Sequence, residues 1–301
     1  MKIKEKKMYI GKKCLICGKT QEYYFKKNTF QYYRCTVCNF TSTYPYPTEK
    51  VIKEHYKNKF TKGNYSLLHG FSKQYRHVYE GIISVLEKQI NKKLNYKNLI
   101  VLDIGCFTGD FLLMLKNRGA KVRGLELQKE AVKIANKKLK GKVFEANVMT
   151  DTFPKLNYNL ITLLGVIEHV NNPHSLFKKC AELLQENGIL LIQTPNSESL
   201  LAKTLKKYWP PYQPIEHIHL FSAESLKIEL KKIGFTNITV TPHWKTLPIE
   251  YVYDMFQNFG PHFYKIFGPL YKLLPPSVKK FSLPFYAGEM IVTAQKNGSP
   301  K

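Results

Sequence analysis

Short apolar runs and stretches of helical periodicity alternate along the middle of this chain. Residues 99–102 form a continuous apolar run, which is typical of a strand buried on both faces. Residues 110–115 carry apolar side chains at helical spacing, and Gly105 and Gly109 lie between the two patterns. The sequence therefore predicts a strand, a glycine turn and a helix. In such a unit the glycines let a ligand approach the backbone closely, and the helix start offers unpaired N–H groups.

The alternation continues towards the C-terminus and predicts a series of βαβ units. Strands are expected at residues 121–127, 142–145, 158–164, 189–193, 235–241 and 289–294, and helices at residues 129–139, 175–184 and 223–233. Such a series builds a doubly wound α/β fold, with a parallel sheet and helices on both faces. Ligands bind such a sheet at the carboxyl ends of its strands.

Two acidic residues follow the first two strands of this series. Asp103 lies two residues before Gly105, so the turn differs from the dinucleotide-binding Gly-x-Gly-x-x-Gly pattern. A carboxylate at this position repels a pyrophosphate and suits a cationic or hydroxylated ligand. Glu126 ends the second strand, where an acid accepts hydrogen bonds from both hydroxyls of a ribose.

Composition sets the broad class of the protein. The chain has 301 residues, of which 44% are hydrophobic, enough for one large domain and a small one. No apolar run reaches the roughly 18 to 20 residues of a membrane span, and the N-terminus lacks the apolar core of a signal peptide. We therefore expect a cytoplasmic protein.

The chain is strongly basic, with a formal net charge of +25. Its lysines are spread over several segments, among them residues 2–13, 129–142, 203–207 and 227–232. This spread favours solvated helix faces, while attraction to anionic substrates, nucleic acid or a membrane surface stays open.

Four cysteines near the N-terminus form two Cys-x-x-Cys pairs, Cys14 with Cys17 and Cys35 with Cys38. A small turn residue follows each pair, as expected of a knuckle that directs two thiolates at one ion. The spacing predicts a four-thiolate zinc site in a small zinc ribbon, which is too small to hold a core without its metal. Disulfides and a redox pair are the less favoured alternatives, because nothing indicates export and neither pair opens a helix after a parallel strand. A closed four-sulfur site favours a structural role over substrate binding.

These patterns divide the chain into four parts. They are a zinc ribbon at residues 1–45, a helical connector at 46–95, an α/β domain at 96–245 and 286–297, and an aromatic helical insertion at 246–285. The connector either covers the mouth of a cleft or packs between the two modules. The insertion is interpreted as a cap on the substrate side, an amphipathic surface for a membrane or lipid-linked glycan, or a packed helical pair.

Several motifs together resemble the class I S-adenosylmethionine-dependent methyltransferases. The resemblance rests on residues 103–109, Glu126 and residues 159–170 and 183–196, and it covers roughly residues 95–296. It is closest to the branch that contains quinone-biosynthesis O-methyltransferases and many bacterial sugar and surface-glycan methyltransferases. It implies a Rossmann-like, mostly parallel sheet with an antiparallel edge strand.

The resemblance also implies a binding site for S-adenosylmethionine. The first acid and glycines would hold the cationic methionine part, the second acid the ribose, the residues after the third strand the adenine, and the end of the fourth strand the sulfonium. These residues are Asp103, Gly105, Cys106, Gly109, Glu126, Leu127, Asn147, Val148, Leu164 and Gly165. Phe107 and Thr108 stand where many relatives have a further glycine, which narrows the turn.

The acceptor side of the site is expected to use one acid and three histidines. Glu168 and His169 follow the fourth strand, and His217 and His219 lie on a proline-braced loop. Histidine is suited to take a proton near neutral pH, so these residues are candidates for a general base or an acceptor anchor. A simple helix-start pair is the alternative for the first two. Some relatives hold a divalent metal here, but Gly165 replaces their first glutamate, which leaves Mg²⁺ undecided.

We conclude from the sequence that the protein is a methyltransferase for a small molecule, with a hydroxyl of a sugar or glycan precursor as the leading acceptor. One alternative is an RNA methyltransferase that uses the zinc ribbon and the basic surface. Another is a catalytically silent binding module. Peripheral membrane contact stays open, and the sequence does not set the oligomeric state.

Overall fold

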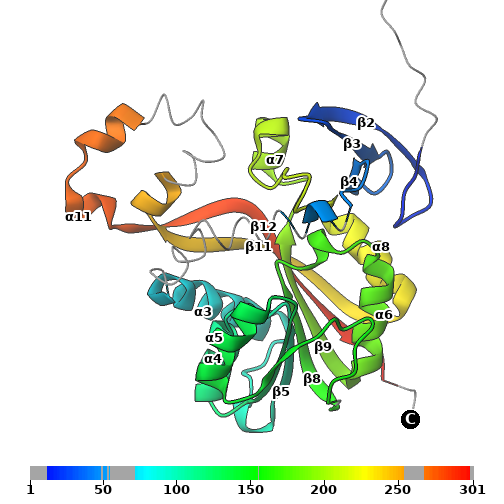
Figure 1. The fold of residues 1–301 in the computed structure, drawn as a ribbon, viewed down its shortest axis with the longest axis vertical. Coiled ribbons are helices and arrows are strands. Elements are labelled where there is room, and N and C mark those ends of the chain that lie inside the picture. Colours follow the sequence, from blue (N-terminus) through cyan, green and yellow to red (C-terminus); the bar gives the residue numbers. More distant parts are fainter. Residues whose placement is uncertain are drawn as a thin grey trace, which may run out of the picture.

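The computed structural model describes residues 12–48, 50–52, 54, 72–154, 156–253 and 268–298, and Figure 1 shows their arrangement. Two sheets organise these residues, one of seven strands and one of five. The expected connector between residues 55 and 71, and residues 254–267 of the expected insertion, lie outside the described residues. No helix among the described residues is long and apolar enough to cross a membrane.

The seven-stranded sheet has the order β11-β12-β9-β8-β5-β6-β7. Strands β9, β8, β5, β6 and β7 are parallel, whereas β12 runs antiparallel to both β9 and β11. This confirms the doubly wound, mostly parallel sheet with an antiparallel edge. The strand bounds are β5 Ile100–Ile104, β6 Lys121–Glu126, β7 Val143–Glu145, β8 Tyr158–Leu164, β9 Leu184–Pro195, β11 Phe235–Pro248 and β12 Ser282–Lys296.

Helices cover both faces of this sheet because alternate residues of each buried strand point to opposite sides. On one face, Leu102 and Ile161 share a core with α6 (Pro173–Leu183) and α8 (Ala223–Ile233). On the other face, Val101 and Leu160 share a core with α3 (Ser72–Gln89), α4 (Asp110–Asn117) and α5 (Lys129–Leu139). The carboxyl ends of the parallel strands are left for the loops that carry the candidate site.

The N-terminal segment forms an antiparallel sheet of the order β1-β2-β3-β4-β10. Its first four strands are β1 Lys12–Lys13, β2 Thr20–Lys27, β3 Phe30–Cys35 and β4 Thr41–Tyr44. The fifth strand, β10 (His219–Leu220), comes from the loop that follows β9, and His219 pairs with Ser42. The small sheet is therefore completed by the large domain and is continuous with it.

The loop between β9 and β10 contains α7 (Leu200–Leu205) and the short helix η3 (Lys206–Tyr208). Two further one-turn helices, η1 (Tyr96–Asn98) and η2 (Ile167–His169), precede β5 and follow β8. Both lie where a strand of the sheet begins or ends, and η2 carries two of the residues expected at the acceptor site.

Strands β11 and β12 are longer than their apolar patterns indicated and extend past the sheet as a two-stranded arm. Pairing with β9 ends at Glu289, while β11 and β12 remain paired as far as Pro248 and Ser282. The expected helical insertion therefore begins and ends with strand residues. Described helical residues at 249–253 and 268–273, and α11 (Pro276–Lys279), occupy the end of the arm (Figure 1).

Candidate functional site

The glycine turn between β5 and α4 has the backbone conformation that its glycines permit. Gly105 and Gly109 have φ angles of +74° and +73°, which side chains of L-residues rarely allow. A Cβ at Gly105 would lie 2.7 Å from Cγ2 of Val166, and one at Gly109 would lie 2.7 Å from Cδ1 of Leu139. Both positions therefore require glycine for backbone conformation and for packing. Cys106 is buried beneath the turn.

Asp103 is a buried carboxylate at the end of β5. Its Oδ1 accepts a hydrogen bond of 2.6 Å from the Thr162 hydroxyl on the neighbouring strand. Burial raises the pKa of Asp103 to about 7, Glu126 raises it further, and the Thr162 bond opposes the rise. No lysine or arginine among the described residues forms an ion pair with this carboxylate. A buried acid of this kind suits a ligand that brings its own positive charge.

The carboxylate of Glu126 connects the end of β6 to the glycine turn. Its Oε2 accepts the N–H of Phe107 at 2.9 Å, and its Oε1 accepts the N–H groups of Leu127 and Gln128 at 2.8 and 2.9 Å. These three bonds fix the carboxylate at the carboxyl end of the sheet. Oε1 is fully used by its two N–H donors, whereas Oε2 retains acceptor capacity, which fits the expected recognition of a ribose hydroxyl.

The residues expected around the adenine and the sulfonium lie at the ends of the next strands. Leu127 is 65% exposed and Val148 is buried, while the Asn147 side chain caps its own turn by accepting the N–H of Met149. Leu164 ends β8, and Gly165 follows with a φ of +67°. A Cβ at Gly165 would meet no atom closer than 3.7 Å, so there is room above it.

A cavity of about 360 Å³ adjoins this edge of the sheet at Gly165. Most of its wall is apolar and comes from α3, the loop before β10 and the arm; these residues are Val78, Leu201, Leu205, Trp209, Pro210, Pro211, Leu247, Pro248, Tyr251, Phe285 and Ala287. Polar side chains form the remainder, namely Glu168, His169, Gln193, Gln213, His217, Lys245 and Glu289. This combination of apolar wall and few polar groups is typical of a site for a small organic molecule.

Glu168, His169 and His217 come together in the cavity wall. One ligand atom from each side chain lies within 4.8 Å of those of the other two, and the two imidazole rings are 4.8 Å apart, edge to face. Nδ1 of His169 lies 2.7 Å from the Glu216 carbonyl oxygen, and Nδ1 of His217 lies 2.7 Å from that of Pro211. Since a carbonyl only accepts, both Nδ1 atoms carry a proton, and Nε2 of each ring carries a lone pair when that ring is neutral.

Burial and the second imidazole keep His169 neutral. Burial lowers the pKa of His169, and His217 lowers it further. Burial raises the pKa of Glu168, whose Oε2 accepts a hydrogen bond of 3.0 Å from Thr194. One carboxylate and two imidazoles are a donor set for a divalent transition metal, whereas Mg²⁺ prefers oxygen ligands. The group is equally arranged to accept a proton from an acceptor hydroxyl.

His219 lies apart from this group, although it was expected beside it. Its side chain is fully buried between Phe40 and Tyr46 of the N-terminal segment, and it does not line the cavity. Burial lowers the pKa of His219 to about 4. Tyr212, which precedes it on the same loop, also packs against the small sheet, with its ring 5.1 Å from that of Tyr32. We therefore assign both residues to the junction between the two sheets.

A half-buried charged group at the base of the arm did not emerge from the sequence patterns. Glu289 bonds to Nζ of Lys245 at 2.6 Å, to Nε2 of Gln193 at 2.6 Å and to Nδ1 of His243 at 3.3 Å. Burial alone would raise the pKa of Glu289, but Lys245 and His243 outweigh it and hold the pKa at about 2. The one indication of this group in the sequence is the glutamate directly before the apolar run of residues 290–292.

Comparison with known proteins decides the family. Residues 72–240 match the family described as methyltransferase domain, which is more than half of the chain. The chain belongs to the methyltransferase-domain family. Its matched segment contains Asp103, Glu126 and the Glu168–His169 pair, and His217 lies within it as well.

Curated relatives of this methyltransferase domain include two ubiquinone biosynthesis O-methyltransferases. The protein from Pelagibacter ubique is 32% identical over 48% of this chain and 60% of its own length. That from Glaesserella parasuis is 32% identical over 32% of this chain and 45% of its own length. The chain thus matches about half the length of these relatives.

The fold is shared with an S-adenosylmethionine-dependent methyltransferase from Thermotoga maritima. The two structures superpose with a TM-score of 0.51 at 17% identity, over 82% of this chain and 99% of the other. This confirms the class I methyltransferase architecture of the larger domain.

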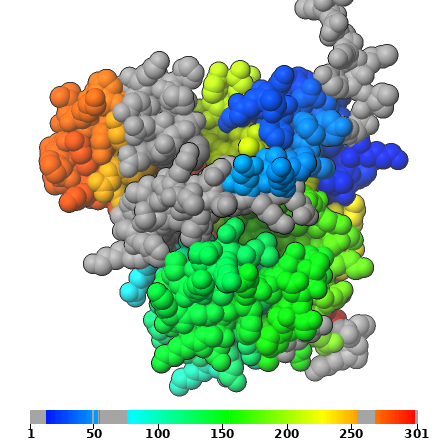
Figure 2. Space-filling view, in the orientation of Figure 1, coloured from blue at the N-terminus to red at the C-terminus, as the bar shows by residue number. Residues whose placement is uncertain are grey.

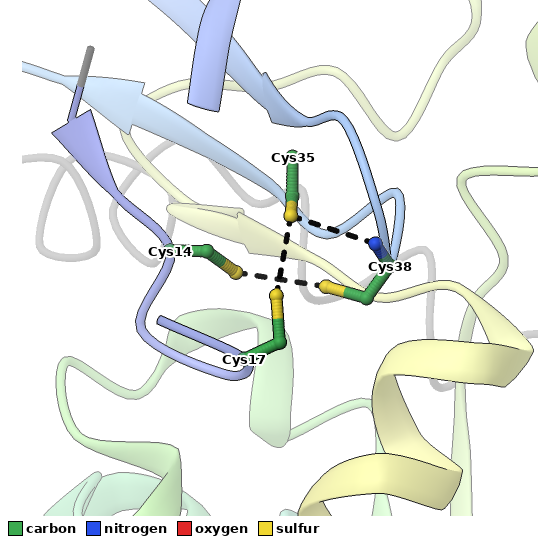
Figure 3. A group of neighbouring side chains, drawn as sticks. All are labelled: Cys14, Cys17, Cys35 and Cys38. Carbon is green, nitrogen blue, oxygen red and sulfur yellow. Dashed lines mark hydrogen bonds between the residues drawn. The ribbon is translucent and has the colours of Figure 1, made fainter. Parts of the chain in front are cut away.

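Ahead of the methyltransferase domain, the four N-terminal cysteines converge on one point (Figure 3). Their sulfur atoms all lie within 4.8 Å of one another, with Cys14 and Cys38 at 3.6 Å and Cys17 and Cys35 at 3.3 Å. Four thiolates about 2.3 Å from a central Zn²⁺ would have sulfurs separated by roughly 3.8 Å, so the cluster needs little adjustment to hold the ion. The arrangement is consistent with a small zinc ribbon.

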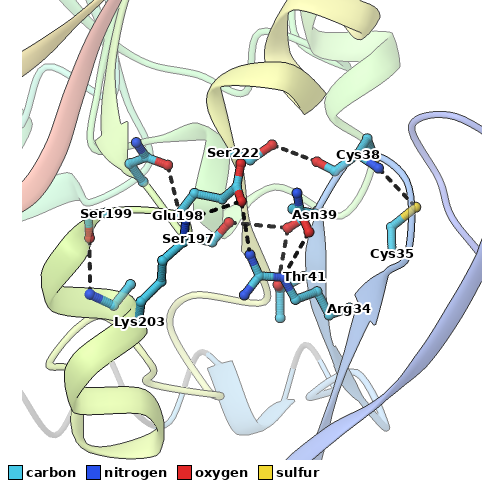
Figure 4. A network of polar contacts seen from close by, with 12 residues as sticks. Arg34, Cys35, Cys38, Asn39, Thr41, Ser197, Glu198, Ser199, Lys203 and Ser222 are labelled. Carbon is cyan, nitrogen blue, oxygen red and sulfur yellow. Dashed lines mark hydrogen bonds and ion pairs between the residues drawn. The ribbon is translucent and has the colours of Figure 1, made fainter.

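Hydrogen bonds join the knuckle of the second cysteine pair to the methyltransferase domain (Figure 4). The Ser222 hydroxyl donates to the Cys38 carbonyl oxygen at 2.6 Å, and the Ser197 hydroxyl donates to that of Asn39 at 3.2 Å. Arg34 forms an ion pair with Glu198 at 3.4 Å. On the methyltransferase side these contacts lie at both ends of the segment between β9 and α8, so the ribbon supports the segment that carries His217.

Proposed function

We propose that the protein is an S-adenosylmethionine-dependent O-methyltransferase of a small molecule. The observation that carries the proposal is the position of Gly165. This residue directly follows β8, which pairs with the strand β5 that carries Asp103, and it also lines the cavity that holds Glu168, His169 and His217. A cofactor held by the two acids would therefore adjoin an acceptor held in the cavity.

The residues at the carboxyl end of the sheet fit the charge of this cofactor. Asp103 provides the buried carboxylate for a cationic methionine group, and Glu126 provides a fixed acceptor for the ribose. When bound, S-adenosylmethionine supplies an electrophilic methyl group. The protein contributes placement of the acceptor and exclusion of water, since most of the cavity wall is apolar.

His169 and His217 are proposed to take the proton that an acceptor hydroxyl loses on methylation. Each ring presents a lone pair on Nε2 when Nδ1 donates to its carbonyl partner. The lowered pKa of His169 keeps this nitrogen able to accept a proton at neutral pH. Glu168 lies beside the two imidazoles as their acidic neighbour. The alternative is that the same three side chains bind a divalent metal ion.

The acceptor that we favour is a hydroxyl of a sugar or glycan precursor. Lys245, Glu289 and Gln193 give the cavity a cluster of charged and amide groups that suits a molecule with several hydroxyls. Tyr251 and Phe285, which are both partly exposed, supply aromatic surface in the same cavity. The cavity volume of about 360 Å³ lies in the range of small-molecule sites, which favours this class over RNA.

We also propose that Cys14, Cys17, Cys35 and Cys38 bind one structural Zn²⁺. Four thiolates fill the tetrahedral coordination of zinc and leave no position for chemistry. The role of the metal is therefore to hold the ribbon against the loop that carries His217.

Labelled methyl transfer tests the proposal. Zinc-loaded protein and S-adenosylmethionine labelled in the methyl group are incubated with fractions of sugars and nucleotide sugars, with catechols and with RNA. We expect label in the sugar fraction, and we expect the His217→Asn variant to abolish most of it. Label in catechols would instead make a phenolic hydroxyl the acceptor. Label only in RNA, or the absence of cofactor binding by calorimetry, would overturn the proposal.

A further inference from the structure

The end of the β11–β12 arm carries a patch of exposed apolar side chains. We call residues 268–284 the arm tip. Its exposed apolar side chains are Leu270, Leu273, Val278, Phe281 and Leu283, of which Leu273 is 81% and Phe281 61% exposed. Single exposed apolar residues are ordinary, but five within one short segment form a patch of the kind that contacts another surface.

The arm tip is an ordered structure with its own internal contacts. The rings of Tyr253 and Tyr271 stack with centroids 3.6 Å apart, and Nζ of Lys279 lies 5.0 Å from the centroid of the Tyr271 ring. The N–H of Ile249 donates to the carbonyl oxygen of Phe281 at 3.1 Å, which ties the two sides of the tip together. The ring stack and this hydrogen bond hold the tip together, while Leu270, Leu273 and Phe281 remain exposed.

The charge of this segment selects the kind of partner. Lys272, Lys279 and Lys280 lie among the exposed apolar residues. The sequence from residue 255 to residue 288 contains no aspartate or glutamate. A second copy of a chain with a net charge of +25 would be repelled, whereas a surface with negative charge would be attracted.

The position of the arm gives the patch access to an extended surface. In Figures 1 and 2 the orange segment that contains α11 projects from the body of the molecule, away from the ribbon. The same arm contributes Phe285, Leu247 and, just beyond its last strand pair, Tyr251 to the apolar wall of the cavity. A surface in contact with the arm tip would therefore lie near the apolar wall of the cavity.

We propose that the arm tip binds the surface of an anionic lipid membrane. The exposed leucines and Phe281 enter the boundary between headgroups and acyl chains, while Lys272 and Lys280 lie among the anionic headgroups. Apolar residues combined with lysines are the composition that such interfacial binding requires. This interaction goes beyond methyl transfer and does not depend on it.

Sedimentation with lipid vesicles tests the proposal directly. The full-length, zinc-loaded protein is mixed with vesicles of phosphatidylcholine alone or of equal parts phosphatidylcholine and phosphatidylglycerol. We expect binding to the anionic vesicles, and we expect about 1 M salt to weaken it because the Debye length falls to about 3 Å. Lys272→Gln with Lys280→Gln should weaken binding about tenfold or more. The matched control is Lys133→Gln with Lys137→Gln, which removes the same charge from exposed positions on α5.

The apolar part of the interaction has its own variant and control. Leu273→Ser with Phe281→Ser should abolish binding, whereas Leu200→Ser should retain it, because Leu200 is equally exposed at 73% but lies on α7. Cofactor affinity and the thermal melt of each variant show whether it is folded. Loss of vesicle binding with both unchanged supports the proposal.

A fluorescent reporter identifies the part of the protein that meets the lipid. The chain has two tryptophans, Trp209, which is buried, and Trp244, which is 60% exposed. In a Trp244→Phe background, Phe281→Trp should shift its emission to shorter wavelengths on anionic vesicles, and Leu200→Trp should not. The proposal is overturned if wild-type protein ignores anionic vesicles, if both reporters respond alike, or if the Leu273 and Phe281 variant changes the oligomeric state instead of vesicle binding.

Discussion

The carboxylate of Glu126 accepts the backbone N–H of Phe107 across 2.9 Å, which links the end of β6 to the glycine turn after β5. Phe107 adopts a φ of +48°, and Glu126 also accepts the N–H groups of Leu127 and Gln128. One carboxylate therefore fixes the turn and presents an acceptor to the proposed cofactor. Its dual use makes it the most informative single residue of the cofactor side.

We predict that Glu126→Ala weakens the binding of S-adenosylmethionine by roughly 10- to 150-fold, since hydrogen bonds to a charged group contribute about 1.5–3 kcal/mol. Isothermal titration calorimetry measures this affinity. Glu130→Ala is the matched control because Glu130 is exposed on the first turn of α5. Equal affinities for Glu126→Ala and the wild-type protein would remove Glu126 from the ribose site.

Because the pKa of Asp103 is raised, we predict that both stability and cofactor affinity depend on pH. Its pKa is about 7 in the folded protein and about 4 in the unfolded chain. Between these values the folded state binds more protons, so the unfolding free energy of the cofactor-free protein should fall as pH rises from about 4 to 7. Affinity for the cationic cofactor should rise over the same window, by up to about tenfold per pH unit.

Asp103→Asn should remove both trends while it keeps an oxygen for the Thr162 hydroxyl. Denaturant unfolding and calorimetry at several pH values measure them. Asp151→Asn serves as the control, because hydrogen bonds from the Asn147 N–H and from Thr150 lower the pKa of that exposed carboxyl. A pH profile of the Asp103→Asn variant that matches the wild-type profile would show that another group titrates.

We predict that replacing either imidazole of the cavity lowers turnover without lowering cofactor affinity. His169→Asn and His217→Asn should lower kcat by about 10²- to 10⁴-fold with little change in cofactor affinity, since a positioned base contributes about that much. His77→Asn, an exposed histidine on α3, is the control. In the wild-type protein kcat should rise with pH until His169, whose pKa burial lowers, is neutral. Unchanged kcat in either variant would exclude that histidine as the base.

We predict that removal of zinc unfolds the ribbon locally and that the unfolding spreads to the loop after β9. Treatment with a chelator should release about one Zn²⁺ per chain and expose the amides of β2 to β4 to hydrogen exchange. Trp209 packs in the same cluster as Tyr32, so its emission should move to longer wavelengths, measured in a Trp244→Phe background. Cys17→Ser should lose the metal, while Cys180→Ala, a cysteine buried far along the chain in the core of the large domain, should keep it. Protected ribbon amides in the metal-free protein would contradict the prediction.

The sequence by itself determined the order of strands and helices and the residues at the ends of the central strands. Apolar runs located β5, β8 and β9 because strands buried on both faces need continuous apolar residues. Local spacing along the chain was enough to identify the acids Asp103 and Glu126 and the two cysteine pairs as candidate site residues. These features depend on short stretches of chain, which is why they could be predicted without a structure.

Only the tertiary structure decided which distant residues meet. His217 joins His169 in the cavity, whereas His219, two residues later, begins β10 and pairs with Ser42 of the small sheet. Glu289 meets Lys245 because the register of β12 against β11 and the bulge after His243 bring them together. Strand partners and register are set by the packing of whole elements, so a local sequence pattern does not predict them. The sequence thus located the residues proposed to bind the cofactor, and the tertiary structure brought together those proposed to face the acceptor.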